Sequence, residues 1–138
     1  NDLIAWKDHP NRKPLLIRGA RQVGKSFVVE KIGAAHFEKL VTVNFEFEPR
    51  FIDCFQTLDP AKIIFALEAI LKQSITPGST LLFLDEIQEC PNAILSLRYF
   101  KEKMPKLHVI AAGSLLEFSL NSPEYRKPVG RVQSLYMK

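Results

Sequence analysis

Side chains that cross-link a chain or ligate a metal are scarce in this 138-residue sequence. It has two cysteines, Cys54 and Cys90, and they form no Cys-x-x-Cys pair or Cys/His cluster. The three histidines, His9, His36 and His108, are equally dispersed, and no residue of ligand type is spaced to join them. We therefore favour two reduced, buried or half-buried thiols over a disulfide or a metal site, and we assign no chemistry to the histidines.

Long hydrophobic runs are also missing. No apolar stretch reaches the roughly 18 residues that a membrane-spanning helix needs, and no signal-peptide pattern follows Asn1. We therefore expect no membrane partner and a cytoplasmic location. The sequence has no repeats or linkers, and 46% of its residues are hydrophobic, so we expect one globular domain over residues 1–138. Because the first residue is Asn rather than Met, we interpret the chain as a fragment of a longer protein.

An excess of positive charge is present, but it is not concentrated along the sequence. The net charge is +4 and the pI is about 9.1, yet lysines and arginines are spread over the whole chain. No aromatic-rich stretch runs through them. We interpret the excess as solvated surface charge plus charge for a phosphate site, in preference to a dedicated DNA groove. Salt-dependent binding of duplex DNA would decide for the DNA alternative.

Short apolar runs alternate with segments of helical periodicity, which predicts a parallel α/β sheet. Asp59-Pro60 supplies an N-cap followed by proline at the first helical position. We expect a three-layer α/β fold in which a central parallel sheet of about five strands carries helices on both faces. The expected strands are 15–17, 40–45, 81–84, 107–112 and a fifth within 129–136; the expected helices are 25–35, 60–73 and 91–104, with a short helix or turn at 51–55.

The loop after the first strand carries the strongest functional signal. Gly19-Ala20-Arg21-Gln22-Val23-Gly24-Lys25-Ser26 fits the Walker A pattern of a phosphate-binding P-loop. Its glycines let the backbone curl around an anion, and its amide groups would point at the β-phosphate from a helix N-terminus. Lys25 would bring positive charge to the β- and γ-phosphates, and Ser26 a hydroxyl to Mg²⁺. A glycine-rich turn with an incidental lysine is disfavoured, because the loop follows an apolar strand and opens a helix.

Two adjacent acids, Asp85 and Glu86, follow the apolar strand 81–84. Asp85 would hold the Mg²⁺ shell beside Ser26, and Glu86 would orient and deprotonate an attacking water. Such a pair can be an ordinary polar strand exit, but its place after a P-loop and behind an apolar run favours a Walker B motif. No Asn/Thr-Lys-x-Asp motif for reading guanine is present. The pair therefore favours ATP hydrolysis, and phosphoryl transfer to a small molecule is the weaker alternative.

In combination, these motifs resemble a family of AAA-type ATPases in bacteria and archaea, whose members are known mostly as predicted ATP-binding proteins. The resemblance implies the AAA+ type of P-loop fold, with ATP and Mg²⁺ as cofactors. It also implies that a lid and a C-terminal domain of unknown role are missing from this fragment, since no sensor-2 arginine can be placed. The similar stretches are Arg18–Ser26, Asn44-Phe45-Glu46, Leu84-Asp85-Glu86-Ile87-Gln88, Gly113-Ser114-Leu115 and Pro128-Val129-Gly130-Arg131, within a resemblance that runs from Leu3 to Met137.

The resemblance further implies roles for single residues. Ser114 would be the sensor-1 residue that contacts the γ-phosphate or the water; the alternative is a serine that caps a helix. Asn44 would hold Glu86 off the water, or be an ordinary strand-end asparagine, and Arg131 would be an arginine finger or a surface arginine. The catalytic set is Glu86, Lys25, Ser114, Asn44 and Arg131, the metal ligands are Ser26 and Asp85, and the nucleotide-binding set is Gly19, Ala20, Arg21, Gln22, Val23, Gly24, Lys25, Ser26 and Phe27.

Two functions follow from this interpretation. The first is a Mg²⁺-dependent ATPase, weakly active as a fragment because an absent finger costs on the order of 10³–10⁵ in rate. The second is a nucleotide-gated switch or scaffold with slow hydrolysis that controls a C-terminal effector. Arg21 is bulky and would project outward, toward a phosphate or a partner. The candidate partners are ATP and ADP, a second copy of the chain, and a nucleic acid or protein held through the C-terminal region.

Overall fold

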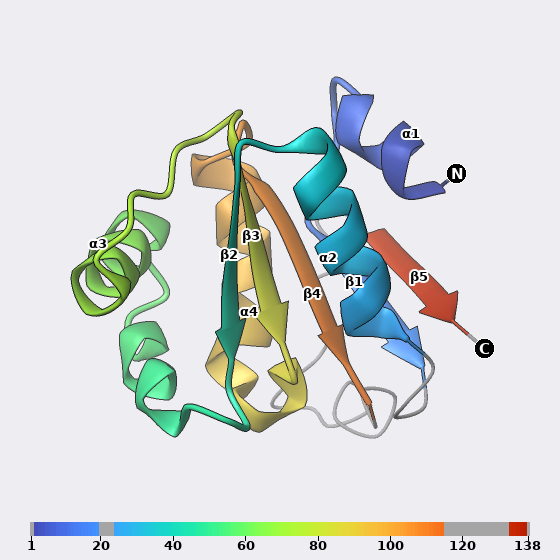
Figure 1. The fold of residues 1–138 in the computed structure, drawn as a ribbon. Coiled ribbons are helices and arrows are strands. Elements are labelled where there is room, and N and C mark those ends of the chain that lie inside the picture. Colours follow the sequence, from blue (N-terminus) through green and yellow to red (C-terminus); the bar gives the residue numbers. More distant parts are fainter. Residues whose placement is uncertain (1, 20–23, 115–132, 138) are drawn as a thin grey trace.

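A five-stranded parallel sheet forms the centre of the molecule (Figure 1). The structure, a computed structural model, describes residues 2–19, 24–114 and 133–137. The strands lie in the order β2-β3-β4-β1-β5, and every neighbouring pair is parallel. The predicted parallel α/β sheet is therefore confirmed. The strands are β1 Leu15–Gly19, β2 Lys39–Asn44, β3 Thr80–Asp85, β4 His108–Gly113 and β5 Gln133–Met137.

Helices cover both faces of this sheet and complete the predicted three layers (Figure 1). On one face, α1 and α2 pack over an apolar cluster that includes Trp6 and Phe83. On the other face, α3, α4 and the 3₁₀ helix η1 enclose a larger cluster that includes Phe51 and Leu97. No helix in the described ranges is long and apolar enough to cross a membrane. The helices are α1 Asp2–Asp8, α2 Lys25–His36, η1 Pro49–Phe55, α3 Pro60–Leu71, η2 Ile87–Glu89 and α4 Pro91–Lys103.

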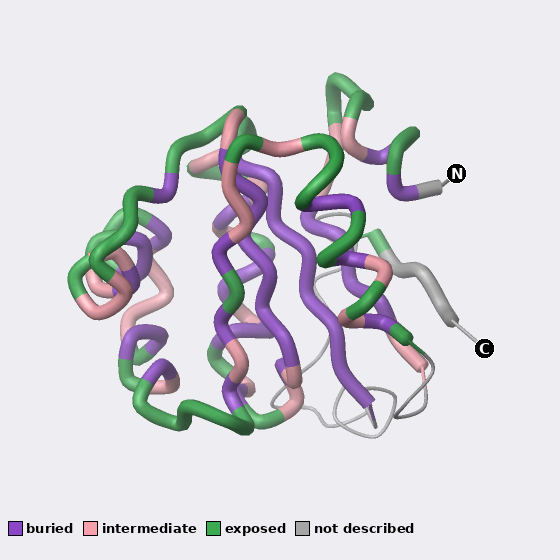
Figure 2. Tube along the Cα trace, viewed as in Figure 1, coloured by how far each residue is buried: buried purple, intermediate pink, exposed green. Residues whose placement is uncertain are grey.

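The strands at the centre are apolar on both sides because both faces of the sheet are covered. In β3, Leu81 and Phe83 enter the cluster beneath α2, whereas Leu82 and Leu84 enter the cluster beneath α3 and α4. All residues of β3 and β4 are buried (Figure 2). These strands form a close-packed frame that fixes the positions of the polar residues at their ends.

The two ends of α3 show how local chemistry sets helix bounds. The helix begins where predicted: Ala61 N donates to Asp59 Oδ1 at 3.1 Å, and Pro60 takes the first helical position. It ends at Leu71, before the predicted end at Gln73. The reason is Lys72, which adopts the left-handed region at φ 54° and donates its N–H to the last turn, closing the helix.

The helix α1 has no counterpart among the elements expected from sequence. It has seven residues, which is too short for a helical period to stand out or for the helix to form alone. Contacts with the sheet hold it instead. The Trp6 side chain is buried and its indole N–H donates to Lys13 O, while Lys7 O lies 3.1 Å from Nε2 of His108. Tertiary packing therefore creates this element.

Candidate functional site

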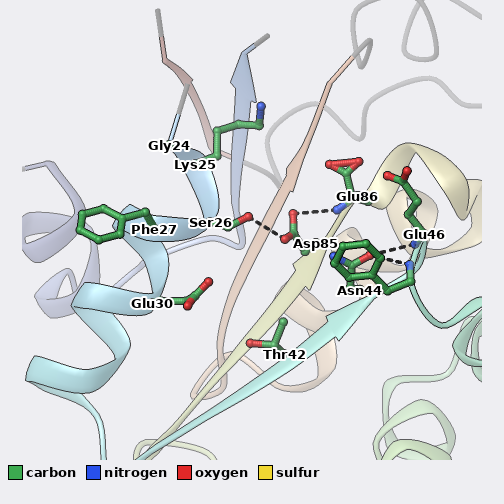
Figure 3. A pocket seen from close by; sticks show the side chains of 11 residues that line it. Gly24, Lys25, Ser26, Phe27, Glu30, Thr42, Asn44, Glu46, Asp85 and Glu86 are labelled. Carbon is green, nitrogen blue, oxygen red and sulfur yellow. Dashed lines mark hydrogen bonds between the residues drawn. The ribbon is translucent and has the colours of Figure 1, made fainter. Parts of the chain in front are cut away.

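Polar side chains converge where β1 and β3 end and α2 begins (Figure 3). A pocket of about 550 Å³ lies there, and its lining includes Lys25, Ser26, Asn44, Asp85 and Glu86. Because the sheet is parallel, the carboxyl ends of its strands share one edge, which is where open α/β sheets bind their ligands. Residues of three sequence-predicted stretches, namely the phosphate loop, the segment at Asn44 and the acidic pair Asp85 and Glu86, therefore line one pocket.

Gly24, at the end of the phosphate loop, has a backbone conformation that favours glycine. Gly24 adopts φ +83°, and a Cβ built there would meet nothing within 4 Å, so the backbone angle and not the space demands glycine. Gly24 O accepts from Val28 N at 3.0 Å, which starts α2. No acidic residue lies in the first turn of α2, so that helix end is suited to an anion. Ala20, Arg21, Gln22 and Val23 lie outside the described residues, and their roles stay predictions.

Lys25 lies at the mouth of this loop with its side chain largely enclosed. The residue is only 6% exposed, and its Nζ donates to Gly19 O at 3.1 Å. A buried ammonium is costly unless it is paired. Here the carbonyl at the end of β1 holds the cation beside the pocket, where it can meet a phosphate.

Ser26 and Asp85 make the central contact of the site. Ser26 Oγ donates to Asp85 Oδ2 at 2.7 Å, although the two residues are 59 positions apart. Asp85 is 7% exposed, and its second oxygen accepts from Glu86 N at 2.9 Å. A hydroxyl and a carboxylate are the hard oxygen ligands that Mg²⁺ prefers. The pair therefore fits the magnesium site predicted from the sequence.

Glu86 is held in an unusual backbone conformation next to Asp85. Its φ of 54° and ψ of 47° lie in the left-handed region, which few residues other than glycine adopt. Such outliers persist only where the surroundings enforce them, and they cluster at functional sites. The carboxylate is half-buried, lines the pocket, and accepts from Gln88 Nε2 at 3.0 Å. Gln88 thus positions Glu86, a role that the sequence motif alone did not reveal.

Asn44 lies beside this pair because β2 aligns Asn44 with Asp85 of β3. Its side-chain oxygen accepts from Glu46 N and from Phe47 N, each at 2.9 Å. The ordinary interpretation, an asparagine that shapes the turn after a strand, therefore has direct contacts in support. The side-chain amide nitrogen is the group left to hydrogen-bond Glu86, and that gating role stays a prediction.

Ser114 directly follows β4 and is buried, with 4% exposure. Its Oγ has no hydrogen-bond partner within residues 2–19, 24–114 and 133–137. A buried hydroxyl without a partner is costly, so a partner is to be expected. The predicted sensor-1 contact would supply one. The alternative helix cap from Leu115 and the predicted finger Arg131 both lie outside the described residues.

The outer rim of the pocket contains side chains that sequence analysis missed or left without a role. Phe27, predicted to contact nucleotide, lines the pocket and is 70% exposed, and Phe47, which also lines the pocket, is 81% exposed. Glu30, Thr42 and Glu46 complete this rim. These positions come from α2, from β2 and from the turn after β2, so no local pattern in the sequence marks them as one group.

The cysteines take no part in the site. Both are free and buried, as expected, and burial raises the pKa of the Cys90 thiol to about 11. A thiol with a raised pKa is a poor nucleophile at neutral pH. Among the described residues, no three His, Cys, Asp or Glu side chains come together as a metal cluster.

The chain is similar to known proteins in its sequence pattern and in its fold. A family model described as an AAA domain matches residues 11–138. In structure, the chain is similar to the ORC1 protein of Aeropyrum pernix, which was solved in complex with DNA. The TM-score is 0.52 at 14% sequence identity, over 99% of this chain and 42% of that chain, so the likeness concerns the fold. A search of curated protein sequences gave no match.

Proposed function

This chain belongs to the AAA domain family, and from that premise we propose that it binds ATP with Mg²⁺ and hydrolyses it to ADP and phosphate. The observation that carries the proposal is the contact between Ser26 Oγ and Asp85 Oδ2 at 2.7 Å, which joins the two halves of the nucleotide site. Lys25 and Glu86 line the same pocket on either side of that contact. The cation Lys25, the proposed metal ligands Ser26 and Asp85, and the candidate base Glu86 therefore all line one cavity.

In the proposed reaction, water attacks the γ-phosphorus in line, the bond to the β–γ bridging oxygen breaks, and ADP leaves. Glu86 accepts a proton from the attacking water. Lys25 stabilises the negative charge on the β- and γ-phosphates. Mg²⁺ held by Ser26 and Asp85 would neutralise further phosphate charge. Ser114 is proposed to position the water or the γ-phosphate, with its buried hydroxyl as the supporting observation.

The test compares two variants of the full-length protein. Glu86→Gln should keep ATP affinity within about twofold while kcat falls on the order of 10²–10⁴-fold, because only the base is lost. Lys25→Ala should weaken ATP binding on the order of 100-fold, because charge-assisted hydrogen bonds are worth about 1.5–3 kcal/mol each. Glu89→Gln, in the exposed neighbour within η2, is the matched control and should change neither quantity. Hydrolysis by Glu86→Gln at the parental rate would disprove the mechanism.

A nucleotide-gated switch with slow hydrolysis is the second candidate, and the bond to Glu86 favours it. The Glu86 carboxylate already accepts a hydrogen bond from Gln88 Nε2 at 3.0 Å, which restrains the group that would take the proton. Asn44 is proposed to add a second restraint on Glu86. The similar ORC1 protein was solved with DNA, which supports a DNA-linked effector. Titrating hydrolysis against protein concentration separates the candidates: an assembly that supplies Arg131 between copies accelerates with concentration, whereas a switch does not.

A further inference from the structure

Two segments that lie far apart in the sequence carry more net positive charge than the whole chain. Segments 7–13 and 98–106 together contain seven basic and two acidic residues, a net charge of +5. The whole chain has a net charge of +4. The remaining residues therefore sum to −1, so the rest of the chain is nearly neutral as a whole.

Two hydrogen bonds bring the segments together. Arg12 Nη2 donates to Lys106 O at 2.6 Å, and Lys101 Nζ lies 3.5 Å from Asn11 O. These contacts join the loop before β1 to the end of α4 and the turn before β4, which are 90 and 94 residues away in sequence. We call segments 7–13 and 98–106 the basic surface. Within it, Lys103 and Lys106 are exposed.

The basic surface lies at the edge of the sheet opposite the nucleotide site. Residue 13 precedes β1 by two positions and residue 106 precedes β4 by two, so both segments lie at the amino ends of parallel strands. Figure 1 shows this edge at the top, beside α1, whereas the strands run toward the nucleotide site at the bottom. Phosphate binding by the P-loop therefore does not explain these charges.

The dipole of α4 explains only part of the positive charge on the basic surface. Lys101 and Lys103 lie in the last turn of α4, where the helix dipole favours cations. Arg12, Lys13 and Lys106 lie outside any helix and gain nothing from that dipole. Close grouping of like charges is unfavourable unless an anion neutralises it. The arrangement thus indicates a polyanionic partner.

We propose that the basic surface binds the phosphate backbone of duplex DNA without reading its sequence. A duplex presents one charge about every 1.7 Å along its axis, so cations from two adjoining segments can contact several phosphates at once. A single strand would also need exposed aromatic rings for base stacking. The large exposed hydrophobic residues of the described chain are Ile4, Phe27, Phe47 and Phe65, and none belongs to the basic surface.

The experiment measures binding of a fluorescent 20-base-pair duplex of arbitrary sequence to the full-length protein as salt is varied. The variant Lys103→Gln/Lys106→Gln removes two exposed charges and disturbs neither hydrogen bond that joins the segments. We expect it to bind on the order of tenfold more weakly at about 0.1 M salt, and the slope of log K against log salt to fall by about 1.8, since each phosphate contact contributes about 0.9. ATP affinity should stay unchanged, because the variant lies at the opposite edge.

The matched control is Lys31→Gln/Lys62→Gln, which removes two exposed charges from α2 and α3. It should retain the parental affinity and slope. Equal losses in both variants, or no loss in the first, would overturn the proposal. Binding of phosphatidylserine vesicles with no binding of duplex would overturn it in favour of a membrane surface. Because the readout is duplex binding, its failure leaves the proposed ATPase activity standing, and a failed ATPase assay leaves this result unaffected.

Discussion

The central sheet has a carboxyl edge, where its parallel strands end, and an amino edge, where they begin. The two edges differ in the charge of their side chains and in how far those side chains are buried. At the carboxyl edge, Lys25, Asp85 and Ser114 are polar groups with 4–7% exposure. At the amino edge, the exposed side chains Lys103 and Lys106 stand in solvent. Burying a charge costs far more free energy than leaving it exposed to water. The buried polar groups of the carboxyl edge are therefore kept at a cost in stability. Such groups are the signature of a site that acts on a small ligand, whereas exposed cations suit the surface of a large one.

The direction of the strands underlies this contrast. In a parallel sheet with helical crossovers, helix N-termini gather at the carboxyl edge and helix C-termini at the amino edge. The start of α2 at Lys25 favours an anion beside the nucleotide site, and the end of α4 at Lys103 favours cations. The backbone alone therefore biases which charges each edge can display, and side chains extend that bias.

The sharpest way to test the independence of the edges is to weaken the metal site. Asp85→Asn keeps the size of the side chain but removes the negative charge that Mg²⁺ requires. We expect the Mg²⁺-dependent part of ATP affinity to fall about 10–100-fold, a range typical of damage to metal sites, while duplex binding stays at the parental level. Calorimetric titration of ATP with and without Mg²⁺ measures the first quantity. Asp53→Asn, in an exposed position of η1, is the control and should match the parent. A parallel loss of duplex binding would show that the edges are coupled.

The convergence of the site residues at the carboxyl edge could be predicted from the sequence, because all strands of a parallel sheet end at the same edge. Once the runs that hold Gly19 and Asp85 are strands of one parallel sheet, their ends must share an edge. The contact of Ser26 with Asp85 follows from that rule. The left-handed backbone of Glu86 and its bond to Gln88 do not follow, because they depend on how one turn packs.

The amino edge could not be predicted for a related reason. Arg12 and Lys106 meet only when α4 is laid along the sheet, and neither the length of α4 nor the loops fix that contact. The basic residues are therefore dispersed in the sequence, whereas the structure brings two basic segments together. The helix α1 was missed likewise, since its seven residues are stabilised by Trp6 against the sheet. Local patterns specify elements, while charge surfaces depend on where loops meet.

The N-cap of α3 is an ordinary polar contact that belongs to neither functional edge. Removing it tests how much such a contact contributes to the stability of the fold. Asp59→Ala removes the acceptor for Ala61 N and should lower the free energy of unfolding by about 1 kcal/mol. ATP affinity and duplex binding should not change, because the contact is structural. Chemical denaturation gives the stability, and Asp59→Asn, which retains a capping oxygen, should recover most of it. A change in ATP affinity would place α3 within the functional apparatus.

The last prediction concerns the amino edge and its dependence on pH. Burial lowers the pKa of His108, and nearby Arg12 and Lys7 lower it further, against the Lys7 backbone contact and Asp8, which raise it. A histidine whose pKa is lower in the folded state binds protons more readily when unfolded, so stability is complete above the unfolded pKa of about 6.5 and falls as the pH drops toward the folded value.

We therefore expect the melting temperature to fall by a few degrees between pH 7.5 and 5.5 on account of this residue, with the Trp6 fluorescence changing first as α1 detaches. His36→Gln, an exposed histidine at the end of α2, should keep that dependence, whereas His108→Gln should reduce it. If the parent and His108→Gln responded equally, the pH dependence would belong to other groups. If duplex binding strengthened at low pH while α1 stayed docked, protonation of His108 would serve the basic surface rather than destabilise the fold.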